Sequence, residues 1–132
     1  MYIDTEGIVL RQTQTVNGRR MITVFTDRYG KLSCGTSVNE GGKNKTALAL
    51  RPFCRGRYNI YKSRDNYSIN NAEAVQSYFE IGEDVDKYLA SSYVLELTDK
   101  LLPEEEVSEQ FYSLLYSYLE AVRGRKKAFY GP

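Results

Sequence analysis

The segment of this sequence that most resembles a catalytic motif is a glycine- and lysine-containing string at residues 41–46, GGKNKT. A phosphate-binding P-loop has the pattern G-x-x-x-x-G-K-[ST], in which a hydroxyl directly after the lysine reaches magnesium. Here Asn44 follows Lys43, and Ser37 occupies the position of the first glycine. The segment therefore fits a surface loop, whose Lys43 and Lys45 could touch a phosphate backbone, better than a nucleotide-hydrolysis site.

Other catalytic chemistries are restricted by the residue types present. The 132-residue chain has no histidine, which excludes a Ser-His-Asp triad and an imidazole general base. Its two cysteines, Cys34 and Cys54, cannot make a four-cysteine zinc site and should pack as small hydrophobic residues. The acidic run at residues 104–106 suits the start of a helix. We therefore expect a protein that is not an enzyme and holds no cofactor or metal.

Basic residues interleaved with aromatic ones are the more informative pattern. Proteins that bind single-stranded nucleic acid need cations along the backbone path and aromatic faces on which bases stack. Strand alternation would place Arg55, Arg57 and Tyr61 on one face, opposite Tyr58 and Ile60. The candidate contacts are Arg19, Arg20, Arg28, Lys31, Lys43, Lys45, Arg51, Arg55 and Arg57, with Tyr29 and Tyr61 as stacking residues.

The charge balance differs between the two parts of the chain. Residues 1–80 contain 12 Lys/Arg and 7 Asp/Glu, whereas residues 81–132 contain 6 Lys/Arg and 10 Asp/Glu. This asymmetry indicates two units, of which the basic one would suit a polyanion. Ordinary solvated surfaces on both units are an equally good interpretation of charge alone.

The elements that would position these residues begin with short strands. Runs rich in β-branched and aromatic residues alternate with turn signals, including Asn17-Gly18, the strongest short hairpin signal. Five strands with a helical turn between the third and fourth predict a five-stranded OB-fold barrel over residues 1–80, because closure hides the edges of short strands. The expected strands are residues 3–15, 21–26, 31–36, 53–62 and 67–77, with the helical turn at 47–50 and further turns at 27–30 and 63–66.

After Gly82 the apolar period lengthens to that of helices. One amphipathic helix is expected over residues 83–102 and a second over 104–123, so residues 81–132 would form the start of an α-helical domain. The apolar stripes are wider than the barrel alone can cover, and we expect more chain to pack against them. The stripes are Ala90, Tyr93, Val94, Leu97 and Leu101 in the first helix, and Val107, Phe111, Leu114, Leu115, Tyr118, Leu119 and Val122 in the second.

Four segments in collinear order resemble the RecO family of recombination-mediator and DNA-repair proteins. The opening strand TEGIVLR at residues 5–11 and the run ITVFTDRYGKLS at 22–33 are similar to its N-terminal domain. LALRPF at residues 48–53 resembles the segment that enters its fourth strand, and residues 88–103 resemble its first long helix. The resemblance extends over about residues 5–122.

The resemblance implies an OB fold that binds DNA, followed by a helical domain. Our own prediction is that the barrel binds single-stranded DNA, and duplex more weakly. The resemblance also implies non-catalytic work: annealing complementary strands and assisting the loading of RecA onto strands coated by single-strand-binding protein. The implied partners are RecR and the tail of single-strand-binding protein. A cytoplasmic location, at the bacterial nucleoid and away from membranes, is expected because no segment resembles a secretory signal or an apolar stretch of eighteen residues. Family members continue through further helices, many with a four-cysteine zinc module, and their third loop is more basic than residues 38–45 here.

Two alternatives remain open from the residues. An OB module of another pathway could bind RNA through the same cations and aromatic faces. A protein-interaction scaffold could use the barrel as a support and dock a partner on the apolar helical stripes.

Overall fold

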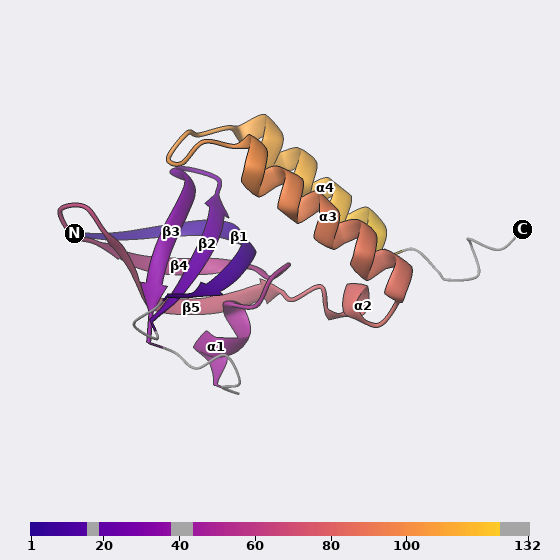
Figure 1. Cartoon of the computed structure of the whole chain (residues 1–132), viewed down its shortest axis with the longest axis horizontal. Coiled ribbons are helices and arrows are strands. Elements are labelled where there is room, and N and C mark those ends of the chain that lie inside the picture. Colours follow the sequence, from indigo (N-terminus) through magenta and orange to yellow (C-terminus); the bar gives the residue numbers. More distant parts are fainter. Residues whose placement is uncertain (16–18, 38–43, 125–132) are drawn as a thin grey trace, which may run out of the picture.

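Five strands form the first part of the chain and helices the second in the computed structural model, which describes residues 1–15, 19–37 and 44–124 (Figure 1). β-Branched and aromatic residues fill the central strands because such side chains pack well on a pleated surface. The prediction of five strands followed by helices is confirmed, and the short helix α2 is an addition to it. The elements are β1 (Tyr2–Gln14), β2 (Arg20–Thr26), β3 (Gly30–Thr36), α1 (Lys45–Ala49), β4 (Arg55–Lys62), β5 (Tyr67–Gln76), α2 (Phe79–Gly82), α3 (Val85–Leu101) and α4 (Glu109–Gly124).

The strands close into a barrel in the order β1-β2-β3-β5-β4. The long strand β1 makes this closure possible, because its first part, up to Ile8, pairs with β4 and its second part, from Gly7 onward, pairs with β2. The β1–β2 pairing has an irregularity between Val9 and Arg11. The contact between β3 and β5 is parallel and short, with only the pairs Cys34–Tyr67 and Gly35–Ser68. The first half of β3 therefore has no strand partner on the β5 side among the described residues.

The barrel interior is filled by alternate residues of all five strands. Val24, Leu32 and Ile60 are fully buried there, as is Tyr58, whose hydroxyl donates to the carbonyl oxygen of Ala49 at 2.7 Å. Both cysteines lie in this core, as predicted, and burial raises the pKa of the Cys34 thiol to about 12 and that of Cys54 to about 11.

A second core joins the outer surface of the barrel to the helices. Ile8, Leu10 and Phe25 point outward from β1 and β2 and pack against Leu115 and Leu119 of α4. The run Ile8-Val9-Leu10 has no polar alternation because both of its faces are buried, one in each core. Figure 1 shows the α3–α4 pair lying along one side and the upper end of the barrel.

The orientation of α3 differs from the prediction. Its buried side carries Lys87, Ser91, Leu95 and Thr98, whereas most of the predicted apolar stripe faces solvent. Tyr93 is 61% exposed, and Leu97 and Leu101 are also exposed. The predicted stripe therefore does not make the contact with the barrel: α3 packs against α2 and β1, and Ser91 on its buried side hydrogen-bonds with the hydroxyl of Tyr118 in α4.

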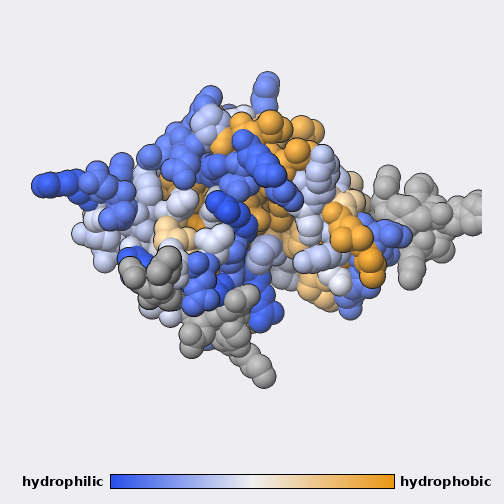
Figure 2. All heavy atoms as spheres, in the orientation of Figure 1, coloured by the Kyte–Doolittle hydropathy of each residue, from blue (hydrophilic) through white to orange (hydrophobic). Residues whose placement is uncertain are grey.

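Helix α4 begins later than predicted, because residues 104–106 run against β3 instead of starting the helix. Phe111, Leu115, Tyr118, Leu119 and Val122 of its stripe face the core, but Val107 and Leu114 are exposed. An apolar groove of about 450 Å³ remains between α3 and α4, bordered by Val94, Phe111, Leu114 and Tyr118. Figure 2 shows hydrophobic surface gathered over this part of the molecule. No helix within the described ranges is long and apolar enough to cross a lipid bilayer.

Candidate nucleic-acid interface

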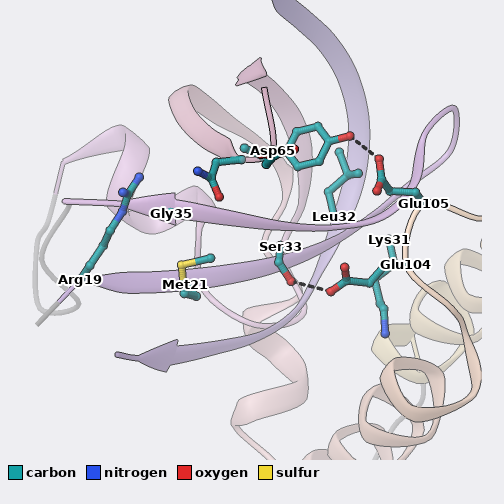
Figure 3. Close-up of a pocket in the computed structure, with 11 residues that line it drawn as sticks. Arg19, Met21, Lys31, Leu32, Ser33, Gly35, Asp65, Glu104 and Glu105 are labelled. Atoms are coloured by element: carbon teal, nitrogen blue, oxygen red, sulfur yellow. Dashed lines mark hydrogen bonds between the residues drawn. The ribbon is translucent and has the colours of Figure 1, made fainter. Parts of the chain in front are cut away.

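A hollow of about 270 Å³ lies on the outer surface of β3 (Figure 3). Its walls come from parts of the chain that are distant in sequence: the start of β2, the β4–β5 turn and the segment that joins α3 to α4. We call residues 102–108 the α3–α4 linker. The lining residues are Arg19, Met21, Lys31, Leu32, Ser33, Gly35, Asp65, Asn66, Tyr67, Glu104 and Glu105.

Arg19 is the sequence-predicted residue that the structure places most directly at this hollow. Its guanidinium lies against Gly35, where a Cβ atom would collide with it, and Nη2 donates to Ser68 Oγ at 3.2 Å. The absence of a side chain at Gly35 thus lets the cation lie flat on the strand. One exposed positive charge therefore stands at one end of the hollow.

The other end of the hollow is acidic. Ser33 Oγ donates to Glu104 Oε1 at 3.2 Å, and the Tyr67 hydroxyl donates to Glu105 Oε1 at 2.5 Å. Burial, together with the hydrogen bond to Glu105, raises the pKa of Tyr67 to about 12, so this hydroxyl remains a donor. The acidic run at residues 104–106 was predicted to start a helix, and no local pattern indicates that two of its side chains reach this hollow.

Lys31 does not present its charge to the hollow, which corrects the prediction that it contacts a backbone phosphate. Its Nζ turns away and donates to the carbonyl oxygen of Asp99 at 2.6 Å and to Asp99 Oδ1 at 3.2 Å (Figure 3). Lys31 is 9% exposed. The side chain therefore ties β3 to α3.

Arg55 is a second correction, because it is held between the barrel and α4. Its Nε donates to the Tyr78 hydroxyl at 3.2 Å, Nη1 contacts Glu6 at 3.4 Å, and Nη2 lies 3.9 Å from Glu120. The guanidinium also lies 4.3 Å from the ring centre of Tyr116. Alternation along β4 did put Arg55 on the outer face, as predicted, but α4 covers this end of that face.

The remaining basic candidates on the barrel lie on several surfaces. Arg20 donates to the side chain of Gln12, and Arg28 is exposed in the turn between β2 and β3. Arg57 is exposed on β4 with a carboxylate residue paired in register on each side, Glu6 on β1 and Glu73 on β5. The cations of β4 therefore do not join those of the hollow in one row.

The candidates around α1 lie apart from the hollow. Lys45 Nζ pairs with Glu73 at 3.6 Å on the surface, and Arg51 is exposed just beyond the helix. Asn44, from the glycine- and lysine-containing string, caps α1 by accepting a hydrogen bond from the amide of Ala47. Lys43 lies outside the described residues.

Both proposed stacking residues are partly exposed. Tyr29 is 38% exposed in the β2–β3 turn, and Tyr61 is 40% exposed near the end of β4. Tyr61 contacts Tyr2 edge to face, with ring centres 5.0 Å apart. One tyrosine lies in a turn and the other on β4, and the structure does not bring them together.

Sequence reasoning missed the cations of the β4–β5 turn. Lys62 lies 5.7 Å over the ring of Tyr67, which lines the hollow, and Arg64 is exposed in the turn itself. The signal was available, since both residues flank the turn that the sequence predicts at residues 63–66. That this turn stands beside Arg19 follows only from the β3–β5 pairing.

The described residues offer no cluster of metal ligands. No three potential ligands among His, Cys, Asp and Glu gather at one point in residues 1–15, 19–37 and 44–124. What the hollow offers is a cation at one end, carboxylates at the other, and the partly exposed apolar side chain of Met21. Such a surface can bind a ligand that carries both charge and an apolar part.

Comparisons with known proteins match both parts of the chain. A family model described as Recombination protein O N terminal matches residues 1–78, and one described as Recombination protein O C terminal matches residues 82–128. A DNA repair protein RecO from Thermoanaerobacter sp. strain X514 is 32% identical over 120 residues, covering 91% of this chain and 48% of the relative. A protein of the same name from Caldicellulosiruptor bescii is 30% identical over 124 residues, covering 94% and 51%. The chain thus spans about half the length of the curated relatives it matches.

Proposed function

This chain belongs to the RecO family, and we propose on that basis that it acts in DNA repair and recombination by binding single-stranded DNA through its barrel. The observation that carries the proposal is the strand order β1-β2-β3-β5-β4 together with a hollow on β3 between two loops. OB folds bind oligonucleotides on this face, with the corresponding loops on either side. We infer that residues 1–80 are an OB-fold domain and residues 81–132 a separate helical unit.

The proposed contacts begin at the basic end of the hollow. Arg19 would meet backbone phosphates there together with Lys62 and Arg64 at the neighbouring β4–β5 turn, and Tyr61 would be a stacking platform. Arg20, which contacts Gln12, would add a cation next to Arg19 in the chain. Arg28 and Tyr29 would extend the path of the bound DNA strand past the β2–β3 turn. Lys45, Arg51 and Arg57 lie around the barrel from this path and would contribute only long-range attraction.

We propose that binding supports strand annealing, because cations that screen two phosphate backbones let complementary strands approach each other. Assistance in loading RecA, contacts with RecR and contacts with the tail of single-strand-binding protein belong to the same proposal. Duplex DNA would bind more weakly than a single strand.

Fluorescence anisotropy of a labelled thirty-base oligonucleotide across a salt series tests DNA binding. We expect affinity to fall with salt, with a slope of about −0.7 for each phosphate contact on a single strand. Arg19→Ala should reduce the slope by about one contact, whereas Lys100→Ala, which removes an exposed charge of α3, should leave it unchanged. Absence of binding by the unaltered protein at low salt would contradict the proposal, and tighter binding of RNA of the same sequence would favour the RNA alternative.

A protein-docking role is the second candidate function, favoured by the exposed apolar surface on the helices. Leu101 and Leu114 are each 66% exposed, and Leu114 borders the groove between α3 and α4. Exposed apolar surface of this kind often marks an interaction site. Titration calorimetry with single-strand-binding protein in the absence of DNA tests this role; heat of binding that is lost in Leu114→Ser would support it, and no heat in the unaltered protein would contradict it.

A further inference from the structure

We propose that the carboxylates of Glu104 and Glu105 make the barrel select single strands over duplex, by keeping phosphate groups out of the hollow on β3. The inference rests on the proposed binding of DNA by the barrel. It assigns a role in binding specificity to the α3–α4 linker, which is outside the barrel in sequence.

The linker is built into the wall of the hollow by its backbone. Glu104 forms a parallel bridge with Lys31, and the amide of Glu105 donates to the carbonyl oxygen of Lys31 at 2.9 Å. These contacts use the part of β3 that β5 leaves unpaired. Close approach also requires Gly30, because a Cβ atom there would lie 2.6 Å from the carbonyl oxygen of Glu106.

The two carboxylates are fixed toward the hollow. Glu105 has a φ of 62°, a conformation that residues other than glycine rarely adopt, and its side chain accepts the hydrogen bond from Tyr67. Glu104 accepts from Ser33, and Figure 3 shows both carboxylates reaching these partners across the end of the hollow. The partners are neutral hydroxyls, and Lys31 is paired with Asp99 instead. The hollow therefore keeps a negative wall.

A negative wall affects the two forms of DNA differently. A duplex presents its phosphates on the outside, about one charge for every 1.7 Å of its axis, and cannot turn its bases toward a small hollow. A single strand can turn a base inward against the partly exposed side chain of Met21 while its phosphates stay outside, near Arg19. Repulsion at Glu104 and Glu105 thus penalises the duplex more than the single strand, which is specificity by exclusion.

The test is the ratio of duplex to single-strand dissociation constants for the same thirty-base sequence at low salt. The double variant Glu104→Gln/Glu105→Gln removes both charges but keeps oxygen acceptors for Ser33 and Tyr67. We expect the ratio to fall by about three- to tenfold, mainly through tighter duplex binding, and to fall less as salt rises.

A charge-matched control comes from the same region of the chain. Glu106→Gln/Glu109→Gln also removes two negative charges, but neither residue lines the hollow. This control should leave the ratio unchanged, and Glu105→Gln alone should lower it by a smaller factor than the double variant.

Two results would overturn the inference while leaving DNA binding by the barrel intact. One is an unchanged ratio in folded Glu104→Gln/Glu105→Gln; the other is an equal fall in the control, which would show a general effect of net charge. Failure of the unaltered protein to bind the single strand at any salt concentration would instead refute the proposed function, and this inference with it.

Discussion

Replacing Arg55 with glutamine is expected to destabilise the protein far more than the same change at Arg57, two residues along the same strand. The side chain of Arg55 is 11% exposed and contacts Glu6, Glu120 and the Tyr78 hydroxyl. Arg57 is exposed and has no such enclosure. The two substitutions therefore compare a cation at the junction of the barrel and α4 with a cation on a solvent-exposed face of the same strand.

The size of the effect follows from the exposure of the partners. Breaking a buried ion pair by removing one member costs about 3–5 kcal/mol, because the other charge is left without compensation. The side chains of Glu6 and Glu120 are 27% and 34% exposed, so water would compensate them in part. We therefore expect a loss of about 2–3 kcal/mol for Arg55→Gln and of less than about 0.5 kcal/mol for Arg57→Gln.

Urea unfolding followed by circular dichroism measures the free energy of unfolding of each variant. Equal dependence of this free energy on urea concentration in both variants would show that they unfold in the same two-state transition. Single-strand affinity measured in parallel should be unchanged in folded Arg55→Gln, because this side chain does not reach the hollow. Losses that agree within about 0.5 kcal/mol between the variants would refute the assignment of Arg55 to the barrel–helix junction.

Three further outcomes are expected. Gly30→Ala should lower the free energy of unfolding by about 2–4 kcal/mol, because Gly30 has a φ of 75° and an added Cβ atom would collide with the linker backbone. Gly82→Ala places its Cβ atom in open space and should change the free energy of unfolding by less than about 0.5 kcal/mol. Thermal melts of the two variants distinguish these outcomes. The hydrogen bond from Tyr78 lowers the pKa of Glu120 below its ordinary 4.5. The ionised Glu120 carboxylate therefore stabilises the folded protein fully above pH 4.5, and this contribution is lost as the pH falls further. The melting temperature of Glu120→Gln should therefore decline less between pH 6 and pH 3 than that of the unaltered protein, and an equal decline would contradict this. Because burial raises the pKa of Cys34 to about 12, an aromatic disulfide reagent at pH 8 should label neither cysteine in the native protein and both in urea; rapid native labelling would contradict the burial.

Local sequence patterns predicted the elements well because their causes are local. Three of these signals depend only on residues that are neighbours in the chain. They are the alternation along β4, the turn at residues 63–66 and the change of apolar period after Gly82. The family resemblance is likewise carried by the residues themselves, and the matches to the N- and C-terminal family models confirm it.

The sequence by itself determined the five strands, the helices after them and the burial of Cys34 and Cys54, since periodicity and turn chemistry operate along the chain. Only the tertiary structure decided which charges face the hollow on β3. Lys31 and Arg55 resemble the other cations in sequence, but packing of the helices turned the first to Asp99 and enclosed the second. The acidic linker reached β3 because β5 pairs with only the end of that strand, and unpaired backbone groups of a strand favour pairing with another segment. Such pairings depend on residues about seventy positions apart, and no local pattern specifies them.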